Sequence, residues 1–253
     1  MDSSLNTPET RQQRLRERVA DGEALILTKL AAEFDVSIDT IRRDLLALEA
    51  EGKVQRVRGG ALPVAPPSVP VMERLDCGRA TGDRLARAAL PLVEDGMVLM
   101  LDGGTSVLQL ARALPPLPRA LVVTPAPAVA LETLARGTET ILIGGRLSRF
   151  GGLAVGQAAV TAIADIAADL CVLGACGIEA GFGLSADDPD EAALRQAMAQ
   201  TSARVSVLTG AVKLGRRARH RVRPCSELDL LITDAEAALT APLAETGLEI
   251  VHA

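Results

Sequence analysis

The stretch Ser37–Leu45 has the sequence SIDTIRRDL, and it predicts an amphipathic helix that starts directly after a tight turn. Ser37 is a favourable N-cap residue, and Gly52 marks the natural end of the helix. At about 100° per residue, the apolar side chains form one stripe that is expected to face a core: Ile38, Ile41, Leu45 and Leu48. The helix therefore has one buried face and one face that is open to a ligand.

The outward face of this helix is centred on Arg43, with Asp39, Thr40 and Ala47 around it and Arg42 at its flank. Short polar side chains around an arginine suit the major groove of DNA. An arginine can bond two acceptors of one guanine, and Thr40 can reach a base or a phosphate. An ordinary three-helix domain with solvated arginines is the alternative.

Two more helices and a hairpin complete a predicted winged helix. Arg11–Ala20 has helical spacing, and a second helix is expected to start at a Thr28 cap and to end at Phe34. Lys53–Arg58 alternates and ends in two glycines, which predicts a β-hairpin wing. The predicted DNA contacts are Thr28, Ser37, Asp39, Thr40, Arg42, Arg43, Lys53, Arg56 and Arg58. Acidic residues share the region, so the basic surface is modest.

The composition of the chain limits which other functions it can have. The formal net charge is −5, which argues against nucleic acid only for the chain as a whole, because DNA binding needs a local basic surface. Four scattered cysteines and two histidines form no metal-binding spacing, so we expect no metal site and no cofactor. With no signal peptide core and no long apolar run, the expected location is the cytoplasm.

A proline-rich segment separates this region from a larger second domain. Leu62–Pro70 contains four prolines and no charge, so we expect domains at residues 1–61 and 73–253 with a stiff linker at 62–72. From residue 75, short apolar strands alternate with helices. The strands are expected at Val98–Leu101, Leu121–Thr124, Ile141–Ile143, Leu170–Leu173, Arg204–Thr209 and Leu228–Thr233. This alternation predicts an α/β domain with a mostly parallel sheet covered on both faces.

A glycine-containing loop, Asp102–Ser106 (DGGTS), follows the first of these strands and precedes a helix. Backbone N–H groups and the helix dipole can hold an anion there, and Thr105 is expected to cap the helix. The loop is neither a Walker loop nor a dinucleotide fingerprint, and a plain tight turn is the alternative. Thr124 and Gly144–Arg146 end neighbouring strands, so they are expected at the same edge of the sheet.

These segments together resemble one family across nearly the whole chain. The TIRRDL helix and the wing RVRGGA are similar to the DNA-binding signature of the DeoR family of bacterial repressors. The stretches LDGGTS, VVTP, IGGRL, LGACGI and GLSADD resemble the sensor domain of that family, which is similar to ribose-5-phosphate isomerase and related sugar-phosphate enzymes. The resemblance implies that Asp102–Ser106 holds a phosphate and that Lys213 reaches the sugar or its phosphate; a solvated surface lysine is the alternative.

The predicted effector-binding set joins the loop to the strand ends: Asp102, Gly103, Gly104, Thr105, Ser106, Thr124, Gly145, Arg146, Cys176 and Lys213. Two positions depart from the family pattern. Cys176 and Gly210 stand where acids are usual, and both changes remove a carboxylate that could bond sugar hydroxyls or move a proton.

The sequence therefore predicts a repressor of a carbohydrate or polyol operon, controlled by a phosphorylated sugar or polyol. Paired DNA-binding domains on a symmetric operator imply at least a homodimer, or a tetramer. The alternative is a sugar-phosphate isomerase or transferase with an appended helical domain. It would draw its general base from Asp102, Asp187, Asp188 and Glu191. A nucleotide-binding oxidoreductase lacks its glycine fingerprint.

Overall fold

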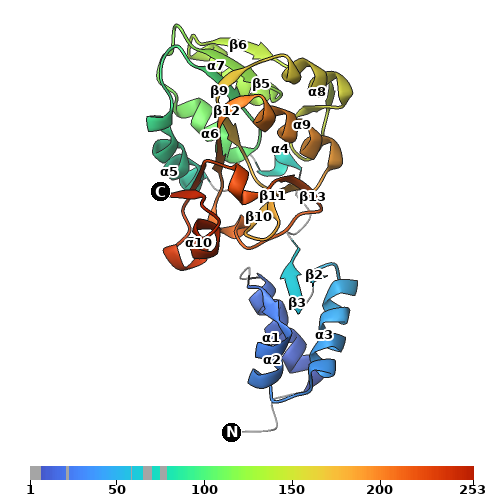
Figure 1. The fold of residues 1–253 in the computed structure, drawn as a ribbon. Coiled ribbons are helices and arrows are strands. Elements are labelled where there is room, and N and C mark those ends of the chain that lie inside the picture. The colour runs from blue at the N-terminus through green and yellow to red at the C-terminus, as the bar shows by residue number, and fades with distance from the viewer. Residues whose placement is uncertain (1–6, 21–22, 58, 65–69, 75–78) are drawn as a thin grey trace.

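The computed structural model describes residues 7–20, 23–57, 59–64, 70–74 and 79–253, and it separates a small N-terminal unit from a large α/β unit (Figure 1). The small unit is a winged helix. Its three strands pair antiparallel in the order β1-β3-β2. Its elements are α1 Pro8–Ala20, β1 Leu25–Ile26, α2 Leu27–Glu33, α3 Ile38–Ala50, β2 Val54–Val57 and β3 Gly60–Pro63.

The predicted recognition helix α3 forms with the expected signals at both ends. The Ser37 side chain accepts a hydrogen bond from the Thr40 amide, and Gly52 follows the helix with φ +71°. The apolar stripe packs into a core of its own, which includes Leu15, Ile41 and Leu48. The three helices and the hairpin of the sequence prediction are therefore present.

Two local predictions in this unit are wrong. Thr28 does not cap α2, because the N-cap is Ile26, two residues earlier. The Leu27 amide donates to the Gly59 carbonyl, so the hairpin fixes the start of the helix. Ile38 is 40% exposed, since it occupies the first turn of α3, beyond the reach of the core. Arg58 lies outside the described residues.

The large unit is built on a seven-stranded parallel sheet in the order β15-β14-β12-β9-β4-β5-β6. In Figure 1, α5–α7 lie on one side of the strands and α8 and α9 on the other. The strands are β4 Val98–Leu101, β5 Leu121–Thr124, β6 Glu139–Leu142, β9 Ala168–Leu173, β12 Ser202–Leu208, β14 Leu230–Thr233 and β15 Glu249–His252. The main helices are α5 Arg79–Ala89, α6 Thr105–Ala113, α7 Pro127–Ala135, α8 Gln157–Ala164, α9 Pro189–Gln200 and α10 Ala237–Ala244.

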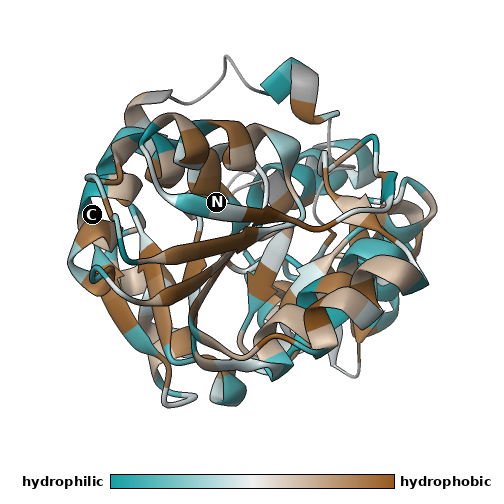
Figure 2. Cartoon of the chain, turned by 90° about the horizontal axis from the view of Figure 1, so that it is seen from above, coloured by the Kyte–Doolittle hydropathy of each residue, from teal (hydrophilic) through white to brown (hydrophobic). Residues whose placement is uncertain are grey.

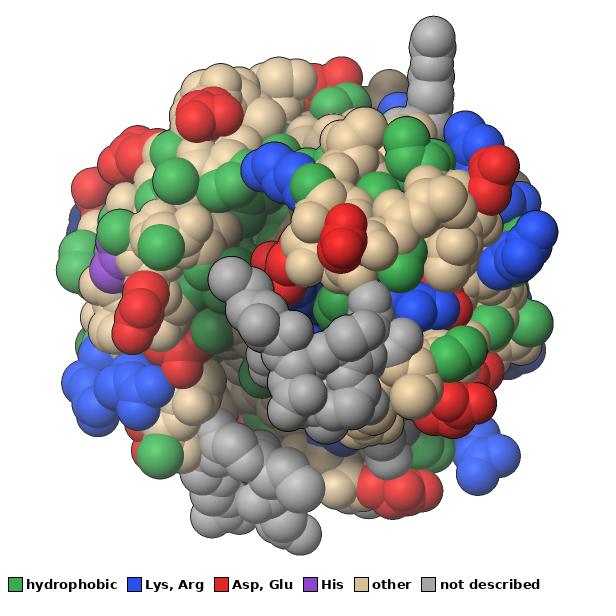
Figure 3. All heavy atoms as spheres, turned by 90° about the horizontal axis from the view of Figure 1, so that it is seen from below, with side chains coloured by type: hydrophobic (Ala, Val, Ile, Leu, Met, Phe, Trp, Pro, Cys, Tyr) green, Lys and Arg blue, Asp and Glu red, His purple; other side chains and the backbone are tan. Residues whose placement is uncertain are grey.

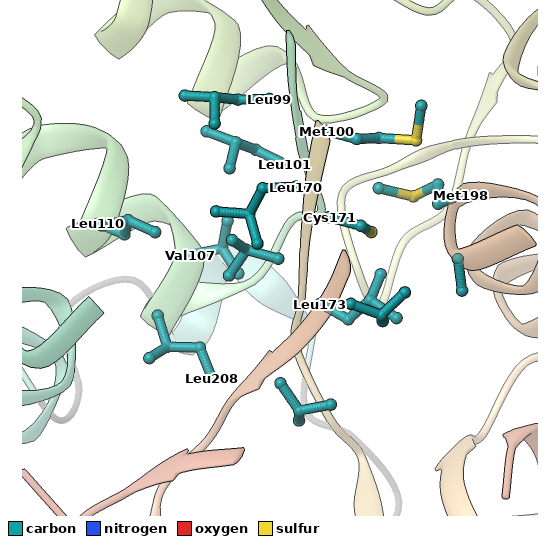
Figure 4. Close-up of a cluster of buried hydrophobic side chains, with 14 of the residues drawn as sticks. Leu99, Met100, Leu101, Val107, Leu110, Leu170, Cys171, Leu173, Met198 and Leu208 are labelled. Carbon is teal, nitrogen blue, oxygen red and sulfur yellow. The ribbon is translucent and has the colours of Figure 1, made fainter. Parts of the chain in front are cut away.

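The core of this unit explains why the central strands β4 and β9 are mostly apolar. Side chains from β4 and β9 point to both faces of the sheet and meet residues of α6 and α9 (Figure 4). Figure 2 shows the same pattern from above, with hydrophobic strands between helices of mixed character. A parallel sheet covered on both faces needs apolar residues at every strand position, and the predicted fold class is confirmed.

Several short elements were not predicted. Three strands form a separate antiparallel sheet, β10 Gly177–Glu179, β11 Gly183–Ala186 and β13 His220–Arg223, and β7 Arg146–Leu147 pairs with β8 Ala154–Val155. Strands of two to four residues have too few positions for an alternation to show. Strand β3 continues to Pro63, inside the predicted linker. A short helix, α4, spans Val71–Arg74 and so begins before the predicted end of the linker. The domain boundaries remain a prediction. No helix in the described ranges is both long enough and apolar enough to cross a membrane.

A buried ion pair joins α1 to α3, and it generates a prediction. Arg11 Nε lies 2.5 Å from Asp44 Oδ2, and both side chains are 5% exposed. Arg11→Ala leaves a buried carboxylate without its cation, which costs about 3–5 kcal/mol in comparable sites. We expect faster amide hydrogen exchange in α1 and α3 and unchanged exchange in the large unit. Arg16→Ala removes an exposed pair with Glu51 and serves as the control; equal effects of the two variants would contradict the argument.

Candidate effector cavity and DNA-binding surface

A cavity of about 350 Å³ opens at the carboxyl ends of three adjacent strands, β12, β9 and β4. Three loops line it, each directly after a strand: Gly103–Ser106, Gly174–Cys176 and 209–213. Other lining residues come from α4, α5, α9 and the segment around Phe150. In open parallel sheets, this edge is where ligands bind, so the cavity occupies the position that the topology favours.

The loop after β4 presents the start of α6 to this cavity. The N-cap residue is Gly104, with φ +88°, and its peptide geometry suits glycine. Thr105 is therefore the first residue of the helix and not its cap, which corrects the sequence prediction. With no side chain capping the helix, its first N–H groups and its dipole are available to an anion.

Asp102 lies beneath the loop and not in the cavity lining. It is fully buried, its Oδ2 lies 2.7 Å from Arg195 Nε, and it accepts the Gly174 amide at 2.9 Å. Burial opposes the charge of Arg195, yet Asp102, Cys176 and Glu191 together raise its pKa above the usual value. Asp102 thus fixes the loops after β4 and β9 and has no direct access to an effector.

Glu191 continues this buried network toward another wall of the cavity. Its Oε2 lies 3.1 Å from Arg195 Nη1, and its Oε1 accepts the Gly151 amide at 2.8 Å. The Ser148 hydroxyl donates to the same carboxylate. The carboxylate therefore accepts from three donors, and it holds the segment Ser148–Gly151 against α9.

Lys213 and Cys176 both line the cavity, as the sequence predicted. Burial lowers the pKa of Lys213 from its ordinary value. The charges of Arg74 and Arg216 lower it further, while Cys176 and Asp187 act in the opposite direction. A lysine that is poorly solvated and near another cation is placed to bind an anion.

The remaining predicted effector residues do not reach the cavity. Thr124 is fully buried, and its hydroxyl accepts the Ala126 amide at 3.1 Å. Gly145 and Arg146 are exposed beside the β7–β8 hairpin, where Arg146 pairs with Asp190 at 2.6 Å. Strands β5 and β6 follow β4 on the side away from β12, and Thr124, Gly145 and Arg146 are absent from the lining, although Phe150 and Gly151 from the connection after β6 do line the cavity.

Several lining residues were missed by the sequence analysis: Arg74, Thr81, Phe150, Gly151, Arg195 and Asp234. Asp234 is an example of their role. Its carboxylate accepts the Ala211 amide and the Arg84 guanidinium, each at 2.8 Å, so it holds the loop that carries Lys213. The position of Asp234 directly after a strand was the signal that could have found it.

The candidate DNA-binding surface is formed by α3 and the hairpin. Arg43 is exposed at its centre. The flanking arginines are paired within the chain, Arg42 with Asp39 and Arg56 with Glu49, each at 2.7 Å. A groove of about 340 Å³ separates α3 from the hairpin and includes Arg42 and Arg56 in its lining. Figure 3 views the molecule from below and shows basic and acidic side chains interspersed on that face.

The other predicted DNA contacts surround this groove. Ser37 and Thr40 are engaged at the start of α3, where their hydroxyls lie 2.9 Å apart. Thr28 and Lys53 are exposed, on α2 and directly before β2. In the described ranges, no group of three or more His, Cys, Asp or Glu side chains is placed to hold a metal ion.

A winged helix joined to an α/β domain with a ligand cavity defines a DNA-binding regulator, and the comparisons specify which kind. Residues 11–65 match the DeoR-like helix-turn-helix domain, and residues 80–235 match the DeoR C-terminal sensor domain. The chain belongs to the DeoR family of transcriptional regulators.

Similar proteins support this assignment along most of the chain. The HTH-type transcriptional regulator GlpR of Haloferax volcanii is 32% identical over 235 residues, which cover 90% of each chain. The glycerol-3-phosphate regulon repressor of Escherichia coli K12 is 31% identical and covers 82% of this chain and 83% of that one. Ribose 5-phosphate isomerase A of Methanocaldococcus jannaschii has a loosely similar fold, with 14% identity, 51% coverage of each chain and a TM-score of 0.38.

The lowered pKa of Lys213 predicts that its charge destabilises the protein without ligand. This cost to the free energy of unfolding is present at pH values below the lowered pKa. It disappears as the pH rises toward 10.5, the ordinary pKa of a lysine. We therefore expect Lys213→Met to raise the thermal unfolding midpoint at pH 7, and the difference from the parent to narrow at high pH. Lys29→Met, at an exposed lysine of α2, is the control and should leave the midpoint unchanged. A lower midpoint in Lys213→Met would show that the charge is stabilising.

Proposed function

We propose that this regulator represses a carbohydrate or polyol operon and that a phosphorylated sugar or polyol controls its binding to DNA. The observation that carries the proposal is the cavity at the strand ends, where the uncapped start of α6 and Lys213 line the same space. The relatives support the ligand class, since one of them is named as a glycerol-3-phosphate regulon repressor.

The cavity suits a phosphate better than it suits catalysis. Helix N-termini with free N–H groups bind phosphate, and a lysine adds a point charge. Three of the four acids that could serve an isomerase are engaged: Asp102 and Glu191 pair with Arg195, and Asp188 caps α9 through the Asp190 and Glu191 amides, while Asp187 lines the cavity. A base that is fully engaged with a buried guanidinium is a poor proton acceptor. Binding without turnover is the activity that this arrangement favours.

The DNA contacts follow from the exposed face of α3. Arg43 is the base-reading arginine of the proposal. Arg42, Lys53 and Arg56 lie beside it and supply phosphate contacts once their carboxylate partners are displaced. We further infer that the protein acts in the cytoplasm as a dimer or tetramer, because two recognition helices on a symmetric operator add their contacts.

Arg43→Ala tests the DNA-reading role. A bidentate arginine contact is worth about 1–3 kcal/mol of discrimination, so the variant should lose roughly 5- to 150-fold in operator affinity per half-site. Its affinity for unrelated DNA should change much less. Fluorescence anisotropy with operator and scrambled duplexes at one salt concentration measures both. Arg119→Ala, on an exposed arginine of the large unit that pairs with Asp95, is the control. Parent-like operator affinity in Arg43→Ala would disprove the proposed placement of α3.

Ser106→Asp tests the phosphate site. Ser106 lines the cavity in the first turn of α6, where an acidic side chain is tolerated by the helix dipole but repels a bound phosphate. We expect Ser106→Asp to weaken binding of glycerol 3-phosphate, or of whichever sugar monophosphate binds the parent in a calorimetric panel, by about a hundredfold or more. Ser106→Asn, which is neutral and similar in size, should stay within about tenfold of the parent. Equal affinities for the two variants would mean that the phosphate lies elsewhere.

A further inference from the structure

The short helix α4 packs at the rim of the effector cavity. Arg74, its last residue, lines the cavity and donates through Nη2 to the Phe150 carbonyl at 2.6 Å. Val71, its first residue, packs against Gly152 so closely that a Cβ on that glycine would lie 2.9 Å from Val71 Cγ1. The helix therefore rests at both ends on the segment Phe150–Gly152.

That segment is tied to the anion-binding loop by the buried network. The Gly151 amide donates to Glu191, Glu191 pairs with Arg195, and Arg195 pairs with Asp102, which immediately precedes the loop after β4. Every charged member of this network is nearly inaccessible to solvent. The buried network therefore links the anion-binding loop to the segment that supports α4.

Arg74 supplies a second cation to the cavity beside Lys213. Burial is the main cause of the lowered pKa of Lys213, and the charge of Arg74 lowers that pKa further. The two cations therefore lie close enough to repel each other. Arg195, the third cation in the lining, is neutralised by Asp102 and Glu191. An anion placed between Arg74 and Lys213 would relieve the repulsion and would be held from two sides.

The position of α4 in the chain connects this cation to the DNA-binding unit. The winged helix ends with β3 at Pro63, and α4 begins at Val71, so α4 is the first helix of the large unit that the chain reaches after the wing. A movement of α4 therefore displaces the end of the segment that leads from the winged helix.

We infer that Arg74 is an effector-binding residue and that it transmits occupancy of the cavity to the DNA-binding unit. The guanidinium exchanges the Phe150 carbonyl for an anionic group of the effector, and α4 moves with it. An effector can shift DNA affinity only through contacts that differ between two conformations, and the contact of Arg74 is such a contact. The inference rests on the proposed function, because it takes the cavity as the effector site.

Three full-length variants test it: Arg74→Ala, Arg74→Lys and the control Arg119→Ala. Calorimetry uses the sugar monophosphate that binds the parent, and operator affinity is measured with and without that compound at saturation. We expect Arg74→Ala to bind the sugar phosphate about ten- to a hundredfold more weakly, as for loss of one charged hydrogen bond. At saturation, its operator affinity should no longer change with the compound, whereas the parent and Arg119→Ala should respond fully. Arg74→Lys keeps a cation on a flexible stem and should show an intermediate response.

The outcomes separate this inference from the proposed function. If the parent responds to the sugar phosphate and Arg74→Ala responds equally, the inference is overturned and the proposed function stands. If the parent binds no compound of the panel, both are overturned. The thermal unfolding midpoint of each variant reports whether the large unit is folded. If Arg74→Ala fails that check, Arg74→Lys becomes the test variant. The inference is also overturned if the sugar phosphate changes the operator affinity of Arg74→Lys as much as that of the parent, because a lysine cannot reproduce the planar contact of the guanidinium.

Discussion

The buried guanidinium of Arg195 is the constraint on which the large unit depends. A charge removed from water must be paired, and its partners must then stay in place, because a buried ion left alone is far more costly than the pair. Arg195 meets this requirement with Asp102 from the end of β4 and Glu191 from its own helix, α9. The geometry of one side chain thereby sets the relative positions of two strand ends, a helix and the segment below α4.

The same pairing decides what kind of site the cavity is. Asp102 and Glu191 are paired with Arg195, while the lining of the cavity combines backbone amides and hydroxyls with the cations Arg74 and Lys213 and the carboxylates of Asp187 and Asp234.

The fold was predictable from the sequence because its signals are local. The N-cap at Ser37, the glycine after α3 and the apolar strands each appear within a few residues. Thr28 was misplaced because the start of α2 depends on a hydrogen bond to Gly59, which is remote in sequence. The candidate site was predictable in part: Gly103–Ser106, Cys176 and Lys213 meet as expected. Thr124 and Arg146 lie outside the cavity, because the order of the strands in the sheet cannot be deduced from the residues at their ends. Arg195 was missed because one of its partners, Asp102, is 93 residues away in the sequence, and the other, Glu191, is one helical turn away.

The internal pairing of Asp39 with Arg42 has a consequence for how such a helix distinguishes DNA sequences. If Arg42 binds a phosphate, as proposed, the Asp39 carboxylate, which is 71% exposed, would face the groove without its cation. Among the base edges of the major groove, an amino group, such as that of cytosine, can satisfy a carboxylate, whereas the acceptor atoms of guanine and thymine repel it. The Asp39 carboxylate would then add little affinity for the preferred DNA sequence, but it would weaken binding to many other sequences.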